Sequence, residues 1–277
     1  MNIKAEFHCH TTASDGKLSP SQVVELANKN NVKLLSITDH DTVDGLIEAQ
    51  NKAKELKINF IPGIELSCNH NNESIHILGY FKEDGYKSPE LINFLKELKL
   101  NRIERATSIV NNLDKYFKIK IDINDIINLS KGTIARPHIA QAIINAGYNY
   151  TFKYIFDNFI GNNSPAYVPN KHIPIDEGIK LLKSYGCIVV LAHPKLIKKT
   201  PLNDILRFEF DGIEAIYYQN FKYETDELIS KAISRNMIIT CGSDFHGISK
   251  DDDKHGNIGD MNIDEYYLNE FMVLYNN

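Results

Sequence analysis

The sequence lacks a long hydrophobic run, a closely spaced cysteine pair and an excess of positive charge. Its apolar stretches, such as Cys187–Ala192, are too short to span a bilayer, and Met1–Glu6 lacks the apolar core of a signal peptide. With 31 Lys and Arg against 36 Asp and Glu, the formal charge is −5, so counterion release does not favour long duplex nucleic acid or anionic membranes. We therefore predict a cytoplasmic protein that binds neither partner.

The cysteine pattern also favours a reducing compartment. No two of the four cysteines form a CxxC pair, and each lies in or beside an apolar run. We therefore expect buried free thiols rather than disulfides. The four residues are Cys9, Cys68, Cys187 and Cys241.

The composition is that of a globular protein with a substantial core. Of the 277 residues, 43% are hydrophobic and 24% are charged. Short β-rich runs alternate with amphipathic segments of helical period, which predicts βαβ units and a mostly parallel sheet. The expected strands are Ile3–Cys9, Lys33–Thr38, Asn59–Leu66, Ser74–Tyr80, Cys187–Ala192, Gly212–Ile216 and Met237–Cys241. The expected helices are Ser21–Asn30, Val43–Leu56, Glu90–Leu113, Ile175–Tyr185 and Tyr223–Arg235.

The alternation stops between about residues 100 and 170, where the pattern is helical and no strand is evident. The length fits one large α/β barrel or two ordinary domains. We expect residues 1–99 and 171–277 to form a barrel, with residues 100–170 as a small helical insertion that caps the substrate.

Histidines and acids gather where the expected strands end. The first strand ends in His8-Cys9-His10, and Asp15 follows in a short loop. Because alternate residues of a strand share a face, His8 and His10 project together. The later candidates are His40 within Asp39-His40-Asp41, Glu65, His76, His193, Asp244 and His246.

Each of these signals has a structural alternative when taken alone. His193 fits a hydrogen-bonded rim histidine, and Asp39-His40-Asp41 fits a helix-capping turn. Taken together, they converge, because the parallel strands of a barrel end on one rim. Burying so many ionisable groups without a compensating ion would be costly. Imidazole and carboxylate ligands suit Mn²⁺, Fe²⁺ or Zn²⁺, so we predict a divalent metal site.

The remaining histidines do not end strands. His70 lies in an Asn-rich turn, His172 follows the insertion and His255 lies near the C-terminus, so we expect all three at the surface. His138, in Arg136-Pro137-His138, is a separate case.

These motifs resemble those of the PHP (polymerase and histidinol phosphatase) family. The matching segments are His8–Gly16, Thr38–Thr42, Gly63–Glu65, Ala192–Pro194 and Gly242–His246, in family order. Arg136-Pro137-His138 and Ala166–Pro169 are similar to a subgroup of nucleoside 3′,5′-bisphosphate phosphatases and 5′-to-3′ exoribonucleases.

The resemblance implies a distorted (β/α)₇ TIM-like barrel whose C-terminal rim carries three divalent ions, with Mn²⁺ as the first expectation and Fe²⁺ or Zn²⁺ as alternatives. It assigns one ion to His8, His10, Glu65 and Asp244. It assigns the second to Asp15, His40 and His246, and the third to Glu65, His76 and His193. A metal-bridging hydroxide would attack the phosphate, because bound cations lower the pKa of water.

Three residues are expected to act on the substrate. Asp244 would orient the nucleophile or accept its proton, and the resemblance tips us toward Arg136 and His138 facing the phosphate. Guanidinium binds phosphate bidentately, although a surface ion pair is the structural alternative for Arg136.

Side chains in and before the insertion have a functional and a structural interpretation. The stripe Lys96, Lys99, Arg102 and Arg105 fits a solvated helix face, or a cleft wall that selects nucleotides. Tyr148, Tyr150 and Phe152 fit core packing or base stacking.

We therefore predict a metal-dependent phosphoric ester hydrolase, a phosphatase or exonuclease. Its expected substrates are nucleoside 3′,5′-bisphosphates and short 5′-phosphorylated RNA or DNA ends. Two alternatives stay open, a histidinol-phosphate phosphatase and a non-catalytic metal-binding PHP module.

Overall fold

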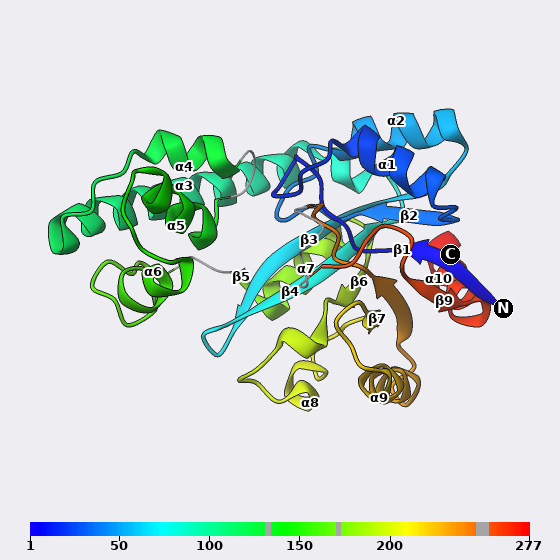
Figure 1. Ribbon diagram of the computed structural model, residues 1–277. Coiled ribbons are helices and arrows are strands. Elements are labelled where there is room, and N and C mark those ends of the chain that lie inside the picture. The colour runs from blue at the N-terminus through cyan, green and yellow to red at the C-terminus, as the bar shows by residue number, and fades with distance from the viewer. Residues whose placement is uncertain (131–133, 170–172, 248–254) are drawn as a thin grey trace. The chain divides into compact units, whose positions relative to one another are not determined.

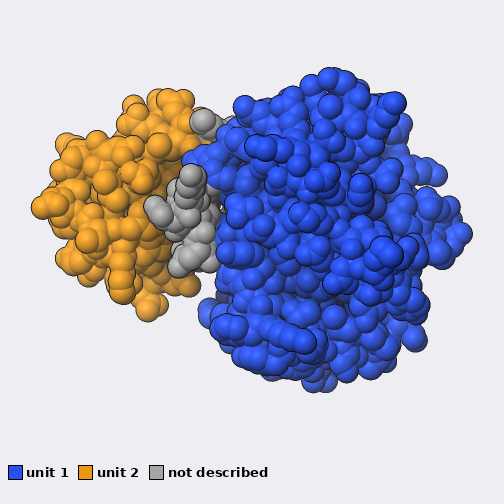
Figure 2. Space-filling model, turned by 45° about the vertical axis from the view of Figure 1, so that its right-hand side comes forward, with its two compact units in different colours: residues 1–92, 172–277 blue, residues 93–171 orange. Residues whose placement is uncertain are grey.

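The computed structural model describes residues 1–130, 134–169, 173–247 and 255–277, which fall into two compact units (Figure 2). Unit 1 comprises Met1–Ile92 and His172–Asn277, and unit 2 comprises Asn93–Lys171. His172 lies outside the described residues, so its expected surface position is not tested. The boundaries of the units are close to those expected for a barrel and its insertion.

Unit 1 is built on a sheet that curls into a barrel (Figure 1). Seven of the nine strands described in this sheet form the barrel wall, in the order β8-β7-β6-β4-β3-β2-β1. These strands are β1 (Asn2–Glu6), β2 (Leu34–Ile37), β3 (Asn59–His70), β4 (Glu73–Phe81), β6 (Cys187–Leu191), β7 (Gly212–Tyr217) and β8 (Ile238–Gly242). Hydrogen bonds from Phe7 N–H to the Cys241 carbonyl (3.1 Å) and from His10 N–H to the Phe245 carbonyl (2.8 Å) join the two end strands. The predicted distorted (β/α)₇ barrel is confirmed.

Helices connect most of the strands. They are α1 (Pro20–Lys29), α2 (Leu46–Leu56), α7 (Ile175–Ser184), α8 (Leu202–Ile205), α9 (Lys222–Ile233) and α10 (Glu265–Asn276), with 3₁₀ turns η1 (Asp84–Lys87) and η2 (Pro194–Leu196). The short strands β5 (Ile173–Pro174) and β9 (Asn262–Asp264) pair with β3 and β1, respectively. Helix α1 begins where predicted, because Ser19 Oγ accepts the Gln22 N–H and the Gln22 side chain accepts the Ser19 N–H.

The sheet is mostly parallel, as expected, and the exceptions are the pairings of β4 and β9. Strand β4 runs antiparallel to both β3 and β6. A two-residue turn at Asn71 and Asn72, with φ of 49° and 60°, joins β3 directly to β4. Such a turn forms a hairpin and leaves no room for a crossover helix. The start of β4, rather than its end, therefore lies beside the carboxyl end of β3.

The barrel interior changes character along its strands. Ile61 and Glu65 share a face of β3, and His76 and Tyr80 share a face of β4, because side chains alternate along a strand. Ile61 and Tyr80 belong to the apolar core, whereas Glu65 and His76 belong to the ionisable cluster described below. Ring contacts join Tyr80 to Phe271 of α10 across 5.4 Å, so the C-terminal helix completes the core.

Unit 2 is helical in its described residues. It contains most of α3 (Pro89–Phe117), together with α4 (Ile123–Ser130), α5 (Arg136–Asn145) and α6 (Phe152–Asn158). Its own apolar core includes Ile109, Leu113, Ile126 and Ile143, all fully buried. Unit 2 therefore has a hydrophobic core separate from that of the barrel.

Two further sequence expectations are tested by the fold. In the described parts of the chain, no helix combines the length and apolarity needed to cross a bilayer. All four cysteines are free and buried, as predicted.

Candidate metal centre

Glu65 is the centre of the ionisable cluster in unit 1. Its side chain is fully buried, and five imidazoles of the described residues lie within 3.4 Å of its carboxylate oxygens. The distances to Oε2 are 3.4 Å from His8, 3.3 Å from His10 and 2.7 Å from His40; those to Oε1 are 2.8 Å from His76 and 2.9 Å from His193. Residues far apart in the sequence thus meet around one carboxylate.

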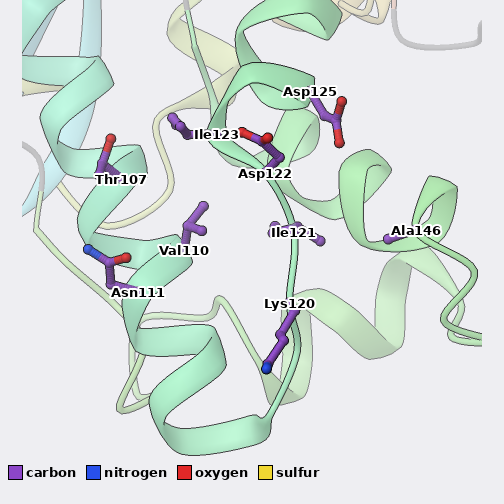
Figure 3. A pocket seen from close by; sticks show the side chains of 9 residues that line it. All are labelled: Thr107, Val110, Asn111, Lys120, Ile121, Asp122, Ile123, Asp125 and Ala146. Carbon is purple, nitrogen blue, oxygen red and sulfur yellow. The ribbon is translucent and has the colours of Figure 1, made fainter.

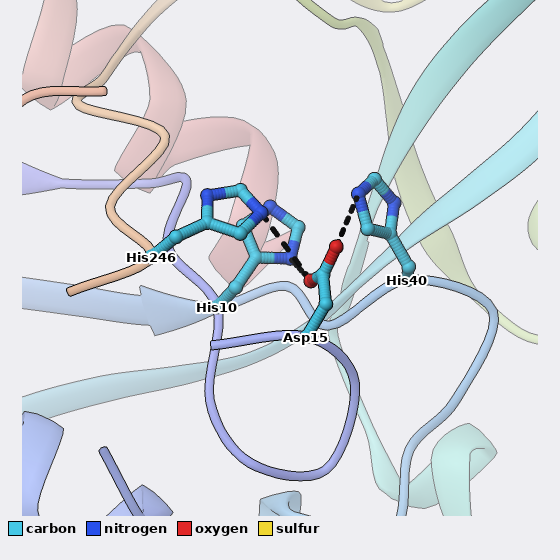
Figure 4. A group of neighbouring side chains, drawn as sticks. All are labelled: His10, Asp15, His40 and His246. Atoms are coloured by element: carbon cyan, nitrogen blue, oxygen red, sulfur yellow. Dashed lines mark ion pairs between the residues drawn. The ribbon is translucent and has the colours of Figure 1, made fainter. Parts of the chain in front are cut away.

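Asp15 organises a second part of the cluster, shown in Figure 4. Its loop returns toward the end of β1, so that its carboxylate lies 3.3 Å from Nε2 of His246 and 3.8 Å from Nδ1 of His10. Nε2 of His40 lies 3.9 Å away on the other side. The three imidazoles and the carboxylate therefore face one another.

Asp244 provides the third carboxylate. Its Oδ1 lies 3.1 Å from Nε2 of His10 and 3.5 Å from Nε2 of His8. Asp244 and His193 both adopt positive φ, of 54° and 26°, which is uncommon for residues with a side chain. Such backbone strain is often found where side chains must be aimed at a functional site.

The structure brings all nine predicted ligands into four overlapping groups whose donor atoms lie within 4.8 Å of one another. The groups are His10, Asp15, His40 and His246; His8, His10 and Glu65; His8, His193 and Asp244; and His40, Glu65 and His76. The three ligands predicted for the second ion, Asp15, His40 and His246, form one group together with His10. The other two predicted sets are divided differently, because His40 faces Glu65 and Asp244 faces His193 as well as His8.

The charges of the cluster suit cations. Burial raises the pKa of the Glu65 carboxyl, but His40, His76 and His8 outweigh burial and hold that pKa well below its usual range. Burial lowers the pKa of His8, yet Glu214, Glu65 and Asp244 outweigh it and raise that pKa well above normal. The Glu65 carboxyl is therefore held ionised, the state in which a carboxylate binds a metal ion.

The surroundings of Glu65 Oε2 support the fit of a divalent cation. Three imidazole nitrogens converge on this buried oxygen, from His40 at 2.7 Å, His10 at 3.3 Å and His8 at 3.4 Å. A buried carboxylate oxygen surrounded by imidazole nitrogens offers the donor set that divalent metal ions bind. The cluster of His, Asp and Glu side chains is thus able to bind metal ions, with the oxygen and nitrogen donors that Mn²⁺, Fe²⁺ or Zn²⁺ accept.

Glu214 is a site residue that the sequence analysis missed. It lies on β7, is fully buried, and its Oε1 is 3.0 Å from Nδ1 of His8. Its Oε2 accepts the backbone N–H of His193 at 2.7 Å. A carboxylate behind a ligating histidine fixes the ring and its tautomer. The available signal was a single acid inside the apolar strand Gly212-Ile213-Glu214-Ala215-Ile216.

Gly242 makes room for this contact. A side-chain carbon at position 242 would overlap Oε1 of Glu214 and Cβ of His8. Because Gly242 has no side chain at the end of β8, the side chains of Glu214 and His8 can approach each other.

Other buried polar groups hold the ligand-bearing loops. Asp39 accepts hydrogen bonds from Thr11 N–H (2.7 Å) and from the hydroxyl of Ser14 (2.5 Å), which shapes the loop before Asp15. The hydroxyl of Tyr217 donates to Oδ2 of Asp244 at 3.0 Å. The residues of Asp39-His40-Asp41 thus divide their roles, with Asp39 supporting a loop while His40 faces the cluster.

His255 differs from the surface position expected for it. Its ring is half-buried and its centroid lies 4.2 Å from that of His246. His70 behaves more as expected, since it lies outside the cluster and packs edge-on against Phe208 at 5.2 Å.

The predicted substrate contacts Arg136 and His138 belong to unit 2. Arg136 donates to Oδ1 of Asn162 at 2.8 Å, and its guanidinium lies 5.8 Å from the Tyr167 ring centroid. Arg105 lies over the same ring at 5.9 Å. In the described ranges no carboxylate lies within 4.0 Å of either arginine, so the surface ion pair considered for Arg136 is not found among these residues. Nδ1 of His138 accepts the Ala135 N–H at 3.0 Å and thereby caps α5.

The basic stripe of α3 divides in the structure. Lys96 and Lys99 are exposed, whereas Arg102 and Arg105 are half-buried. Burial lowers the pKa of Arg105, and the nearby charge of Arg136 lowers it further. The solvated-face interpretation therefore fits the two lysines better than the two arginines.

A surface pocket of about 470 Å³ in unit 2 is a different place (Figure 3). Its lining includes Asp122, Asp125 and Lys120, but neither Arg105 nor Arg136. Two carboxylates against one ammonium disfavour an anion, so this pocket is a poor phosphate site.

Comparison with known proteins gives concordant matches. The PHP domain family model matches residues 6–163. A 5′-3′ exoribonuclease of Haemophilus influenzae is 31% identical over 253 residues, covering 89% of this chain and 91% of that protein. A 3′,5′-nucleoside bisphosphate phosphatase of Chromobacterium violaceum is 26% identical over 260 residues, covering 87% and 86% of the two chains.

A solved structure agrees in fold. A protein from Bifidobacterium adolescentis, assigned as a metal-dependent phosphoesterase, matches with a TM-score of 0.80 and 26% identity, covering 98% of this chain and 96% of that one. The family match spans more than half of the chain and includes β2, β3 and the segments after β1 and β2, where Glu65, His8 and His40 lie. By its sequence and by its fold, this chain belongs to the PHP domain family.

Proposed function

We propose that the protein is a metal-dependent phosphoesterase that hydrolyses nucleoside 3′,5′-bisphosphates and trims short 5′-phosphorylated oligonucleotides. The observation that carries the proposal is the buried Glu65 carboxylate surrounded by five imidazoles from four different segments. The relatives named exoribonuclease and bisphosphate phosphatase narrow the substrate to nucleotides.

The nine predicted ligands would hold three divalent ions, with Mn²⁺ as our first choice and Fe²⁺ or Zn²⁺ as alternatives. Bound cations would supply an activated water and neutralise charge on the phosphate in an in-line displacement. The three carboxyl groups of the ligand set stay ionised, because the pKa of Asp15, Glu65 and Asp244 lies below the usual range in spite of their burial.

The chain's own side chains would orient the reactants. Tyr217 donates to Oδ2 of Asp244, which fixes that carboxylate, and Oδ1 then faces the cluster. We assign to Asp244 the orientation of the attacking water or the acceptance of its proton. Glu214 would hold the His8 ring through Nδ1 and leave Nε2 for ligation.

Arg136 is our candidate for a second phosphate contact, together with His138. The support is local to unit 2: Arg136 and Arg105 flank Tyr167 without an acidic partner in the described residues. Two guanidiniums held close together raise each other's energy, and a phosphate would relieve the repulsion. His138 caps α5 through Nδ1, which places it in the same first turn as Arg136.

The test is phosphate release from adenosine 3′,5′-bisphosphate by the purified protein with Mn²⁺. His193→Ala should reduce the rate to background, because it removes a ligand predicted for the third ion. His70→Ala is the matched control, since His70 lies outside the cluster, and it should retain the wild-type rate. Release that continues undiminished after the metal has been stripped would overturn the proposal.

Assays on the same purified protein distinguish the two alternative functions. A panel that includes histidinol phosphate would identify a histidinol-phosphate phosphatase by a higher kcat/KM for that compound. Elemental analysis that finds fewer than about two ions per chain, without hydrolysis of any ester, would favour a non-catalytic metal-binding module. The four buried free thiols support our proposal of a cytoplasmic location.

A further inference from the structure

Charge is distributed unevenly between the two units. Residues 93–171 carry eleven Lys or Arg against six Asp or Glu, a formal charge of +5. The rest of the chain carries 20 against 30, a formal charge of −10. A basic segment in an otherwise acidic protein is the electrostatic pattern of a nucleic-acid-binding surface.

Unit 2 also exposes an ordered group of aromatic rings. The rings of Tyr148 and Tyr150 are parallel to within 8° with centroids 6.4 Å apart, and those of Tyr150 and Tyr154 are parallel to within 8° at 5.2 Å. Tyr150 is 38% exposed and Tyr154 is 46% exposed. We call these three residues the tyrosine stack. Tyr148 packs against the core of unit 2, whereas the rings of Tyr150 and Tyr154 are partly exposed.

The backbone holds the tyrosine stack in place. Thr151 Oγ1 accepts the Tyr154 N–H at 3.2 Å and begins α6, while Tyr150 N–H donates to the Tyr148 carbonyl at 2.9 Å. Phe159 packs edge-on beneath Tyr150 and Tyr154, with centroids 5.0 and 5.6 Å away. A ligand that stacks on these rings would pay little entropy for ordering them, because they are already fixed.

Lysines adjoin the stack. The hydroxyl of Tyr148 accepts the Lys120 N–H at 2.9 Å and donates to the Lys118 carbonyl at 3.4 Å. Lys115, Lys118 and Lys120 are exposed, and within the described ranges no carboxylate lies within 4.0 Å of their ammonium groups. Exposed aromatic rings in a segment of net positive charge suit a ligand that has both phosphates and flat bases.

We propose that the tyrosine stack binds unpaired bases of a single-stranded oligonucleotide while Lys118 and its neighbours contact the phosphates. The proposal rests on the proposed function and names its substrate class, a single strand long enough to present bases beyond the terminal nucleotide. Parallel rings favour bases over an acidic peptide, which would need the charge but not the stacking geometry.

The test is binding of a single-stranded phosphorothioate RNA of about ten nucleotides to the full-length protein with Mn²⁺, followed by fluorescence anisotropy. Tyr150→Leu and Tyr154→Leu should each weaken binding about tenfold, because leucine keeps apolar surface but removes the π face. Tyr150→Phe and Tyr154→Phe keep the ring and should bind within about twofold of wild type.

Matched controls separate the stack from exposed aromatics in general. Tyr223 is 66% exposed and Tyr266 is 62% exposed, and both lie in unit 1 outside the stack. Tyr223→Leu and Tyr266→Leu should bind the RNA as wild type does. The same RNA in a duplex should bind the leucine variants of the stack and wild type equally, since its bases are not free to stack.

Salt dependence tests the lysines independently. Lys118→Ala should reduce the slope of log K against log salt by about 0.7, the value for one phosphate contact with a single strand. Unchanged affinity in both Tyr150→Leu and Tyr154→Leu would overturn the proposal, as would equal losses in the phenylalanine variants. Wild-type phosphate release from adenosine 3′,5′-bisphosphate is measured in parallel, so that a failure of the proposed function is seen separately from a failure of binding.

Discussion

The two units bury opposite kinds of interior. Unit 1 places nine histidine, aspartate and glutamate side chains together beside its apolar core, whereas the described core of unit 2 consists of residues such as Ile109, Leu113 and Ile126. Apolar burial alone favours the folding of unit 2. In unit 1, desolvation of charge opposes folding unless an opposite charge balances it. In unit 1, the side chains that carry the chemistry therefore also affect folding stability. In unit 2, folding stability depends on apolar packing instead.

Metal removal should have the largest effect and should act on unit 1 alone. A site with free cation at about 1,000 times its Kd stabilises the folded state by about 4 kcal/mol, and this is lost on chelation. Hydrogen exchange followed by mass spectrometry resolves the units, because the chain has no tryptophan to serve as a reporter. Peptides within 34–66 and 187–217 should lose protection, while peptides within 103–126 keep it. Equal loss in both units would break the comparison.

A cavity in unit 2 should have the converse effect. Ile109 is fully buried in that core, so Ile109→Ala should lower the free energy of unfolding of unit 2 by about 2–4 kcal/mol. The metal content of the protein, measured by elemental analysis, should not change. Leu100→Ala on the same helix is the control, because Leu100 is 58% exposed and its loss should cost less than about 0.5 kcal/mol.

The carboxylate behind His8 should have a smaller effect, on metal affinity rather than on folding. Glu214→Gln keeps the shape but removes the charge that orients His8, and should weaken metal binding by about 10–100-fold. Gly242→Ala should act in the same direction by displacing the Glu214 side chain. Metal titration of both variants checks this, with the exposed Glu209→Gln as the control. Wild-type affinity in both variants would show that His8 needs no such support.

The smallest effect concerns Glu73 of unit 1, whose carboxylate accepts hydrogen bonds from backbone N–H groups and needs no cation. Burial raises the pKa of Glu73, but the N–H groups of Lys199, Lys198 and Thr200 outweigh it and lower that pKa from 4.5 to about 2. Because the pKa is lower in the folded state, this stability is present above pH 4.5 and is lost as the pH falls toward 2.

Thermal unfolding against pH checks the Glu73 contribution. The difference in unfolding free energy between wild type and Glu73→Gln should be about 1–2 kcal/mol near neutral pH and should shrink between pH 4.5 and 2. The exposed Glu83→Gln should show no such difference. A gap between wild type and Glu73→Gln that stays constant with pH would rule out an ionised Glu73 as its source.

Strand periodicity predicted much of the site. His8 and His10 follow one strand at alternate positions, and His193 follows an apolar run, so their places at strand ends could be inferred without coordinates. The motif order predicted the PHP family, which is confirmed. The metal roles of the nine residues and the substrate roles of Arg136 and His138 stay predictions.

Other features could not be inferred because they depend on pairing between distant segments. The direction of β4 follows from a turn at Asn71 and Asn72 that resembles an ordinary loop in sequence. Glu214 looks like an isolated acid until β7 lies beside β8 and its carboxylate meets His8. The position of His255 beside His246 likewise has no periodic signal, since it lies in no strand or helix.

The sequence by itself determined which side chains are ionisable, which lie at strand ends and which family the chain belongs to, because these follow from residue type, spacing and motif order. Only the tertiary structure decided which carboxylate lies at the centre and how the ligands divide among overlapping groups. The physical reason is that hydrophobic periodicity sets the face on which a residue lies. Closure of the barrel and the direction of each strand then set the distances between side chains of different strands. Metal coordination depends on those distances.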